Sequence, residues 1–183
     1  MNNPFNIKSA LLVCAFLAAP IAHAAPMSQA EYDSGKTRIG ADFKTGKAAC
    51  DTMSSNAKDI CVEEANGKEK VARAELEAAH SGKAADQNKV LVVKAEAAYA
   101  VAKEKCDDLA GNVKDVCVKE AKAVEVKALA DAKLGKQIGE ATTEAADDKR
   151  DANYKVAAEK CDALAGDSKA ACVSAAKTKF GKS

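Results

Sequence analysis

Six cysteines form the most regular pattern of the chain and are the residues best suited to chemistry. They stand in three pairs with ten residues between the members of each pair: Cys50 and Cys61, Cys106 and Cys117, and Cys161 and Cys172. Cysteine thiols form disulfides, bind soft metal ions or exchange electrons. Zinc sites usually contain close pairs such as C-x2-C with further ligands, and thiol redox enzymes use C-x-x-C. The long spacing therefore favours structural disulfides over a metal site or a redox centre.

The other reactive side chains suggest no catalytic site. His80 is the one histidine after residue 24, and a lone histidine beside a helix end is typical of a structural residue. Acidic pairs such as Asp107-Asp108 and Asp147-Asp148 are adjacent on a helix and do not face each other. We predict no catalytic residue, no cofactor and no metal, and hence a protein that is not an enzyme.

The cysteine pairs lie in a sequence unit that occurs three times. Cys106 follows Cys50 by 56 residues, and Cys161 follows Cys106 by 55. An aspartate comes directly after each first cysteine, and an aromatic residue stands seven positions before it: Phe43, Tyr99 and Tyr154. This spacing indicates an internal repeat in which each copy is one supersecondary unit. Lysines recur at Lys58, Lys114 and Lys169; we interpret them as solvated residues of a second helix, with a ligand site shared along the array as the alternative.

The middle of each cysteine segment predicts a turn between two helices. Steps of three and four residues before the turn place one stripe on a helix in the second copy: Val92, Ala95, Tyr99, Ala102, Cys106 and Leu109. Gly111 and Gly166 are suited to a left-handed residue that closes a helix, whereas the first copy has Ser55 at this point. The residue that follows, Asn56, Asn112 or Asp167, is expected to cap the next helix.

This turn predicts which cysteines bond. Because the turn is near the midpoint of each segment, the two cysteines lie at a similar height on an antiparallel hairpin, and we predict the pairs 50 with 61, 106 with 117, and 161 with 172. Closing such a loop stabilises the fold by about 3 kcal/mol in the chain-entropy estimate. The alternative is a continuous helix, in which the two cysteines of a segment share one face and bond to another chain.

The pattern predicts an all-α fold of tandem antiparallel helix hairpins. A chain with 4% aromatic residues and 3 prolines, rich in Ala, Lys, Glu and Asp, is typical of long helices. We expect about six helices, near residues 28–54, 57–80, 84–110, 113–134, 140–165 and 168–179, with breaks at 80–82 and 135–139. The three hairpins then occupy residues 25–82, 83–138 and 139–183. The apolar run at 90–93 is expected in the core, at the centre of the fold or at an interface.

Residues 1–24 are typical of a secretory signal peptide. Lys8 precedes an apolar run at 10–19, and the small residues Ala22 and Ala24 suit a signal peptidase, so we predict cleavage after Ala24. Cys14 lies inside the apolar run rather than after a small residue, and no lipid attachment is expected. The run is too short to span a bilayer. The predicted location is the periplasm, or the medium after secretion.

Charge in the mature chain is balanced. Residues 1–24 contain one lysine and no acid, so 27 basic residues remain beside 27 acidic ones. Both signs are mixed along every predicted helix, so no basic face is available to neutralise phosphates or lipid head groups. We therefore expect no nucleic acid partner and no membrane span, and the sequence leaves any small-molecule ligand unidentified.

The cysteine unit also supports a resemblance. Residues 99–122 contain the pattern aromatic-x6-C-D-x-L-x-G-N-x-K-D-V-C-V-x-E-A-K, and the chain resembles Ala/Lys-rich exported helical proteins of Gram-negative bacteria with repeated C-x10-C units. Some of these are labelled cell-envelope biogenesis proteins. The resemblance covers most of the mature chain and implies a place in the envelope, but no particular activity. The third copy departs from the pattern at Ala170, Ser174 and Ala175.

These features favour a non-enzymatic periplasmic scaffold or interaction protein of the cell envelope. Its expected partner is another envelope protein or a second copy of itself. One alternative is a module that binds a small apolar or envelope-derived ligand between the Ala-rich helices. Another is a thiol-disulfide redox protein, because each second cysteine lies near a helix N-terminus, where a thiolate is favoured.

Overall fold

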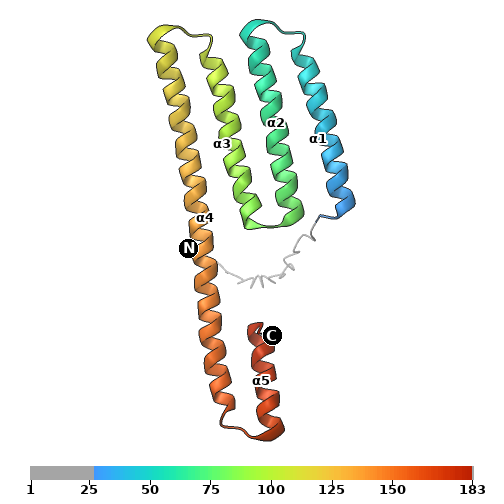
Figure 1. Cartoon of the computed structure of the whole chain (residues 1–183), viewed down its shortest axis with the longest axis vertical. Helices are drawn as coiled ribbons and strands as arrows, with labels where there is room; N and C mark the ends of the chain where they lie inside the picture. The colour runs from blue at the N-terminus through green and yellow to red at the C-terminus, as the bar shows by residue number, and fades with distance from the viewer. Residues whose placement is uncertain (1–26, 183) are drawn as a thin grey trace, which may run out of the picture.

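The computed structural model describes residues 27–182, which form five α-helices joined by short turns (Figure 1). These are α1 (Gln29–Cys50), α2 (Ser55–Ser81), α3 (Ala84–Cys106), α4 (Gly111–Cys161) and α5 (Gly166–Phe180). Every regular element in this range is a helix, which confirms the all-α class. The predicted signal peptide, with its cleavage position after Ala24, lies outside the described residues.

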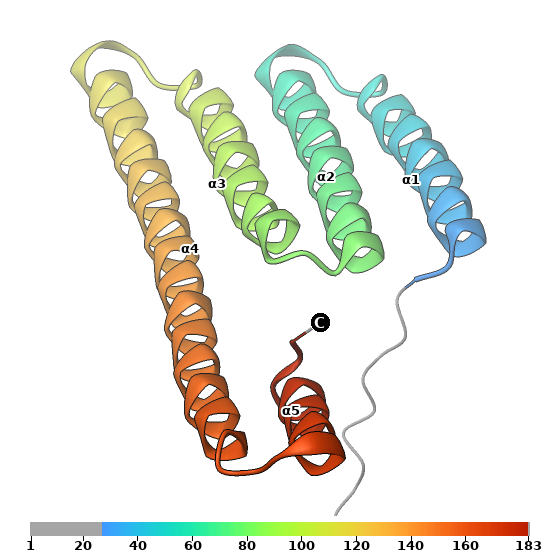
Figure 2. The ribbon, with the colours of Figure 1, turned by 60° about the horizontal axis from the view of Figure 1, so that its bottom comes forward.

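The helices are arranged in a single layer. Helices α1, α2, α3 and the first half of α4 lie side by side, and the chain reverses direction at each turn (Figure 1). A view rotated by 60° shows the same order (Figure 2). Packing is confined to consecutive helices: α1 with α2, α2 with α3, α3 with α4, and α4 with α5. Within residues 27–182 no second layer covers the first, so both broad faces of the layer are open to solvent.

Three of the helices end at the first cysteine of a pair. α1, α3 and α4 end at Cys50, Cys106 and Cys161, several residues before the ends predicted from sequence. The amide of Met53 donates to the carbonyl oxygen of Cys50, and the same bond is made three residues after each of the other two cysteines. These bonds tighten the chain into a turn. The prediction that Leu109 extends the helical stripe is therefore wrong, because Leu109 lies in the turn and is exposed.

Small residues set the distance between neighbouring helices. Gly67 of α2 lies against Ala97 of α3, where an added Cβ would be 3.1 Å from the Ala97 Cβ. Further along the same interface, Val90 and Val93 of α3 pack with two alanines of α2, Ala74 and Ala78. Part of the apolar run at 90–93 thus lies at an interface as predicted, although Leu91 is exposed. Such contacts bury little area per residue, which leaves the packing thin.

The break predicted at 135–139 is wrong, and five helices are found in residues 27–182 instead of six. α4 runs without interruption through Gly135 and Gly139. Neither glycine has the positive φ angle that Gly82 adopts at the end of α2, where φ is +64°. Glycine weakens a helix by about 1 kcal/mol relative to alanine but does not by itself end one. The boundary predicted between the second and third hairpins, after residue 138, therefore falls inside α4.

The residues after this point explain why α4 does not fold back. The first cysteines Cys106 and Cys161 are 55 residues apart, and this offset aligns Val93 with Asp148 and Ala95 with Arg150. Ala95 is buried, and Val93 packs against the small core. A turn at 135–139 would bring the charges of Asp148 and Arg150 into the equivalent interface, at a cost that apolar contacts in so thin a layer would not offset.

The continuous helix leaves part of α4 without a neighbour. All residues from 133 to 150 are exposed, because α3 packs along the first part of α4 and α5 along the last part (Figure 1). At the far end Tyr154 meets Phe180 edge to face, with ring centroids 6.4 Å apart. Lys182 forms an ion pair with Asp151. Among the described helices, none combines the length and apolar character needed to cross a bilayer.

A pair of glycine substitutions tests the course of α4. An added Cβ meets open space at both Gly139 and Gly82, which differ in backbone conformation. We expect Gly139→Ala to raise the free energy of unfolding by about 0.5–1 kcal/mol, because alanine favours a helix. Gly82→Ala is expected to lower it by about 1 kcal/mol, because alanine is strained at positive φ. Urea unfolding followed by circular dichroism measures both. Destabilisation by Gly139→Ala would contradict a continuous α4.

Candidate functional site

The six cysteines form three disulfides that span the turns. Cys50 bonds to Cys61, Cys106 to Cys117, and Cys161 to Cys172. The Cα atoms of each pair are 5.6 to 5.7 Å apart, within the usual range for a disulfide. The predicted pairs are confirmed, and the alternative of a continuous helix through each segment is wrong. Each disulfide joins the last residue of one helix to the first two turns of the next.

Each of the three disulfide-bonded turns is also closed by an ion pair. The lysine that recurs in the cysteine segments binds the aspartate that follows the first cysteine, at N–O distances of 2.9 to 3.0 Å: Lys58 with Asp51, Lys114 with Asp107, and Lys169 with Asp162. Both side chains are well exposed in every pair, so each contributes at most about 1 kcal/mol. The recurrence of these lysines thus has a structural explanation, and no shared ligand site is needed to account for it.

The turns share one backbone conformation. Ser55, Gly111 and Gly166 have φ angles of +53°, +56° and +56°. The residue before each of these is extended and forms the N-cap: Ser54, Ala110 and Ala165. The prediction of Asn56, Asn112 and Asp167 as N-caps is therefore wrong, because these residues lie inside the first helical turn. Asn56 instead donates from Nδ2 to the carbonyl oxygen of Glu104, 2.9 Å away, and so ties the first turn to the end of α3.

Burial differs between the two sulfur atoms of a pair. The residues Cys50, Cys106 and Cys161 are fully buried, whereas their partners are half-buried. A thiol-disulfide enzyme exposes its attacking sulfur to the substrate, and one residue of each pair here is closed off. Within residues 27–182, no group of three His, Cys, Asp or Glu side chains is placed to hold a metal ion.

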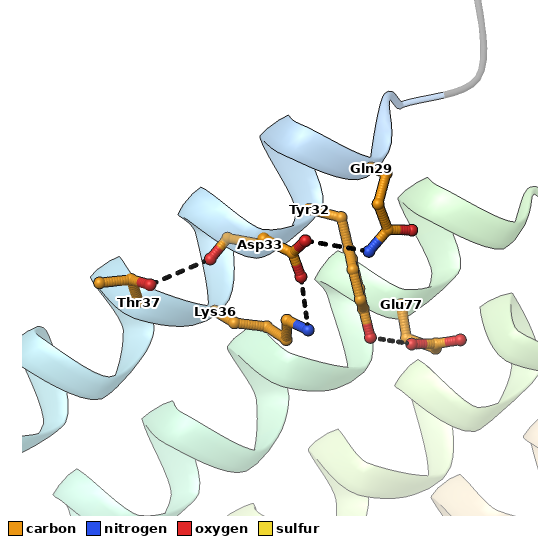
Figure 3. Close-up of polar contacts among 6 residues, drawn as sticks. All are labelled: Gln29, Tyr32, Asp33, Lys36, Thr37 and Glu77. Atoms are coloured by element: carbon orange, nitrogen blue, oxygen red, sulfur yellow. Dashed lines mark hydrogen bonds and ion pairs between the residues drawn. The ribbon is translucent and has the colours of Figure 1, made fainter.

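A polar cluster joins the beginning of α1 to the end of α2. The hydroxyl of Tyr32 donates to Glu77, 2.5 Å away (Figure 3). This hydrogen bond raises the pKa of the Tyr32 hydroxyl. The Tyr32 ring also stacks on His80, with ring centroids 4.4 Å apart. His80 donates from Nδ1 to the carbonyl oxygen of Met27, 3.1 Å away. His80 therefore is a helix-end residue, as predicted, and it fastens the chain that enters α1.

Lys36 covers the outer side of this cluster. Its ammonium group lies 4.6 Å from the centre of the Tyr32 ring and 2.7 Å from the carboxylate of Asp33. The hydrogen bond between the two side chains lowers the pKa of Asp33 and raises that of Lys36 (Figure 3). Both changes favour the charged forms of exposed side chains. The cluster has the features of a structural clasp between α1 and α2.

A second contact of this kind joins α3 to α4. Glu125 is the buried charged residue of the described chain, and Lys122 binds it at 2.5 Å. The same lysine lies 4.8 Å from the centre of the Tyr99 ring. The hydrogen bond that Lys122 donates to Glu125 raises the pKa of Lys122. Tyr99, which was predicted to lie on the helix stripe, thus contacts the neighbouring helix through the ammonium group of Lys122.

The layer also carries an open groove of about 710 Å³ between α2 and α3. Its apolar lining includes Val71 of α2 and Val101 of α3, on either side of the close contact at Gly67. Two ion pairs cross between the helices at its ends: Lys105 with Glu64 at 3.4 Å, and Lys94 with Glu75 at 2.6 Å. An apolar trough between charged ends is suited to hold an apolar ligand or an apolar side of another helix.

A larger and less open hollow of about 920 Å³ lies beside the bare part of α4. α3 contributes Ala84 and Leu91, and α4 contributes small residues together with four acids: Glu140, Glu144, Asp147 and Asp148. Lys136 and Arg150 form ion pairs with Glu140 and Asp147. The groove between α2 and α3 has the more apolar lining of the two.

Comparison of the chain with protein-family models, with curated proteins and with solved structures finds no match. The site must therefore be interpreted from its own geometry, which is that of a single helix layer with three disulfide-bonded turns and an apolar groove.

The first turn provides a test of the shared backbone conformation. Ser55 occupies a left-handed position where the other two turns have glycine, and a side chain there is strained by about 1 kcal/mol. We expect Ser55→Gly to raise the free energy of unfolding by about 0.5–1 kcal/mol. The reverse change in the second turn, Gly111→Ser, is expected to lower it by a similar amount. Urea titrations of the oxidised proteins measure both, and a neutral or destabilising Ser55→Gly would count against the common turn.

Proposed function

We propose that this chain is an exported, non-enzymatic scaffold or interaction protein of the cell envelope, built of antiparallel helix hairpins that are each closed by a disulfide. The observation that carries the proposal is the single layer. Because each helix packs only against its neighbours in sequence, most of the surface is available for contacts with other molecules. A protein of this shape has a large accessible surface and little enclosed space for an active site.

The disulfides support an extracytoplasmic location. Disulfides form and persist in oxidising compartments and are rare in the cytosol of mesophiles. The predicted signal peptide at 1–24 supplies the route to such a compartment, and the resemblance noted above suggests the envelope of a Gram-negative cell. The three bonds stabilise helices that share little apolar area, which suits a protein that must keep its shape without a large core.

The groove between α2 and α3 is the surface best suited to a partner. Its apolar lining around Val71 and Val101 is accessible, and it is bounded by charges of both signs. An amphipathic helix of another envelope protein satisfies both properties, because its apolar side fits the trough and its charges meet the ends. The same groove favours a second candidate function, the binding of a small apolar or envelope-derived ligand.

Photo-cross-linking in intact cells tests the scaffold role. A photoreactive amino acid at position 71 or 101 is expected to give discrete higher-mass adducts with another envelope protein. The same group at position 44, an exposed lysine on α1, serves as the matched control and should give none. Adducts that appear equally at all three positions, or at none, would contradict a partner in the groove.

The ligand hypothesis predicts a different result. A fluorescent apolar probe such as N-phenyl-1-naphthylamine would bind the purified protein saturably, and Val101→Glu would abolish binding while Val126→Glu on α4 would not. The scaffold hypothesis predicts weak, non-saturable binding that neither substitution changes. Cross-linking and probe binding therefore separate the two functions.

Export is tested by expressing the full chain in a Gram-negative host. We expect the periplasmic fraction to contain a chain that begins at Ala25, with an intact mass six hydrogens below that of its reduced form. Recovery of the uncleaved chain with free thiols from the cytosol would contradict the proposed location.

A further inference from the structure

One side of α4 has no helix packed against it among the described residues. α4 contacts α3 along its first part and α5 along its last part. Both neighbours lie on the same side of α4, as the two views show (Figures 1 and 2). The buried residues of α4, Glu125, Ala132 and Cys161, are spaced by whole numbers of turns and mark that covered side. The opposite side is open along the whole helix.

Apolar residues gather on this open side. Seven large apolar residues of α4 are exposed, and six of them share one stripe: Val113, Val116, Val124, Leu134, Ile138 and Val156. At about 100° per residue, the stripe is turned by roughly 140° from the covered side. Val124, Ile138 and Val156 are 68%, 58% and 56% exposed. Val126 is the exception, because it lies off the stripe. A line of exposed valine, leucine and isoleucine over this length is costly in water and favours association.

The charges along the stripe indicate what covers it. We propose that a second copy of this chain packs its α4 antiparallel against this one, about a two-fold axis near residue 140. This register brings Asp131 opposite the partner's Lys149, and by symmetry Lys149 opposite the partner's Asp131. It also brings Glu120 opposite Lys160 and Val124 opposite Val156. All six side chains are exposed, and no ion pair within residues 27–182 uses any of the four charged ones.

The complementarity depends on direction and register. In a two-fold antiparallel pair, each residue meets the residue at an equal distance on the other side of the axis. The two-fold axis therefore repeats each contact, so that every acid–base pair and the valine pair occur twice in the dimer. A parallel, in-register pair would instead place Asp131 against Asp131 and Lys149 against Lys149, which is unfavourable. Because every other helix lies on the far side of α4 (Figure 1), two copies meet without obstruction.

The contact also gives the bare segment of α4 a neighbour on its open side. The two-fold axis falls inside residues 133–150, the stretch without an intramolecular neighbour. Two layers joined in this way form one wider layer with the long helices at its centre. Dimerisation through α4 uses a surface distinct from the groove between α2 and α3, so it stands or fails independently of the proposed function.

Sedimentation analysis over a wide concentration range tests the proposal. The full chain is produced in the periplasm of a Gram-negative host and purified without reductant. We expect a reversible monomer–dimer equilibrium. Val156→Glu should raise the dissociation constant at least tenfold, because it places a charge in the apolar seam. Val126→Glu is the matched control, since Val126 is equally exposed, at 54%, on the same helix but off the stripe, and should change it less than about twofold.

Charge reversal tests the register without altering the apolar stripe. Asp131→Lys and Lys149→Asp alone each place like charges face to face and should weaken the dimer, and the double variant should restore it. Both positions are exposed, so the monomer is expected to fold in every case, which circular dichroism verifies. A monomer at all concentrations, equal weakening by Val126→Glu and Val156→Glu, or a double variant no stronger than the single ones would each overturn the proposal.

Discussion

A covalent bond across three of the four turns in residues 27–182 sets the register of the helices that each of these turns joins. The disulfide joins the last residue of one helix to the beginning of the next, and the same turn carries a left-handed residue and an Asp–Lys ion pair. Of these three, the disulfide makes the largest contribution, about 3 kcal/mol in the chain-entropy estimate. It also restricts how the two helices slide and separate. The side chains between the helices are mostly alanine, and they would not define that register by shape alone.

The same constraint explains why a single layer can be stable. An ordinary domain buries the apolar face of one layer against another, whereas here the largest fully buried side chains are the first cysteines of the three pairs. Helix neighbours meet through Gly67 and Ala97, and through clasps such as Tyr32 on His80 and Lys122 on Glu125. These contacts are local and lie between sequence neighbours. The outer surfaces are thereby left available, which is the physical basis for proposing an interaction protein.

Much of this arrangement could be predicted from the sequence, because the cysteine spacing and the turn residues carry local information. The disulfide pairs follow from the ten residues between the two cysteines of each pair, and the all-α class follows from the composition and the helical stripe before the turn. The continuity of α4 could not be predicted in the same way, since two glycines suggest a break when considered alone. The decisive residues are Asp148 and Arg150, which stand where the previous copy has an apolar and a small residue. Their effect becomes clear only when the interface made by Val93 and Ala95 is known.

The side-chain contacts between helices could not be predicted from the sequence either, and the reason is physical. Tyr32 and Glu77 are 45 residues apart in sequence, and nothing near either residue indicates that the ends of α1 and α2 meet. Glu125 resembles the many solvated acids of the chain until the packing of α3 on α4 buries it. Similarly, the left-handed conformation of Ser55 follows from the disulfide and the turn, and a serine gives little local sign of it.

The most direct test of this account is a map of the disulfides in the native protein. The chain is digested without reductant after its free thiols are blocked, and the linked peptides are identified by mass spectrometry, for monomer and dimer separately. The account predicts the pairs 50 with 61, 106 with 117, and 161 with 172 in both species, with no blocked cysteine among the six. Bonds between different turns, bonds between chains, or free thiols would contradict a layer held by its turns.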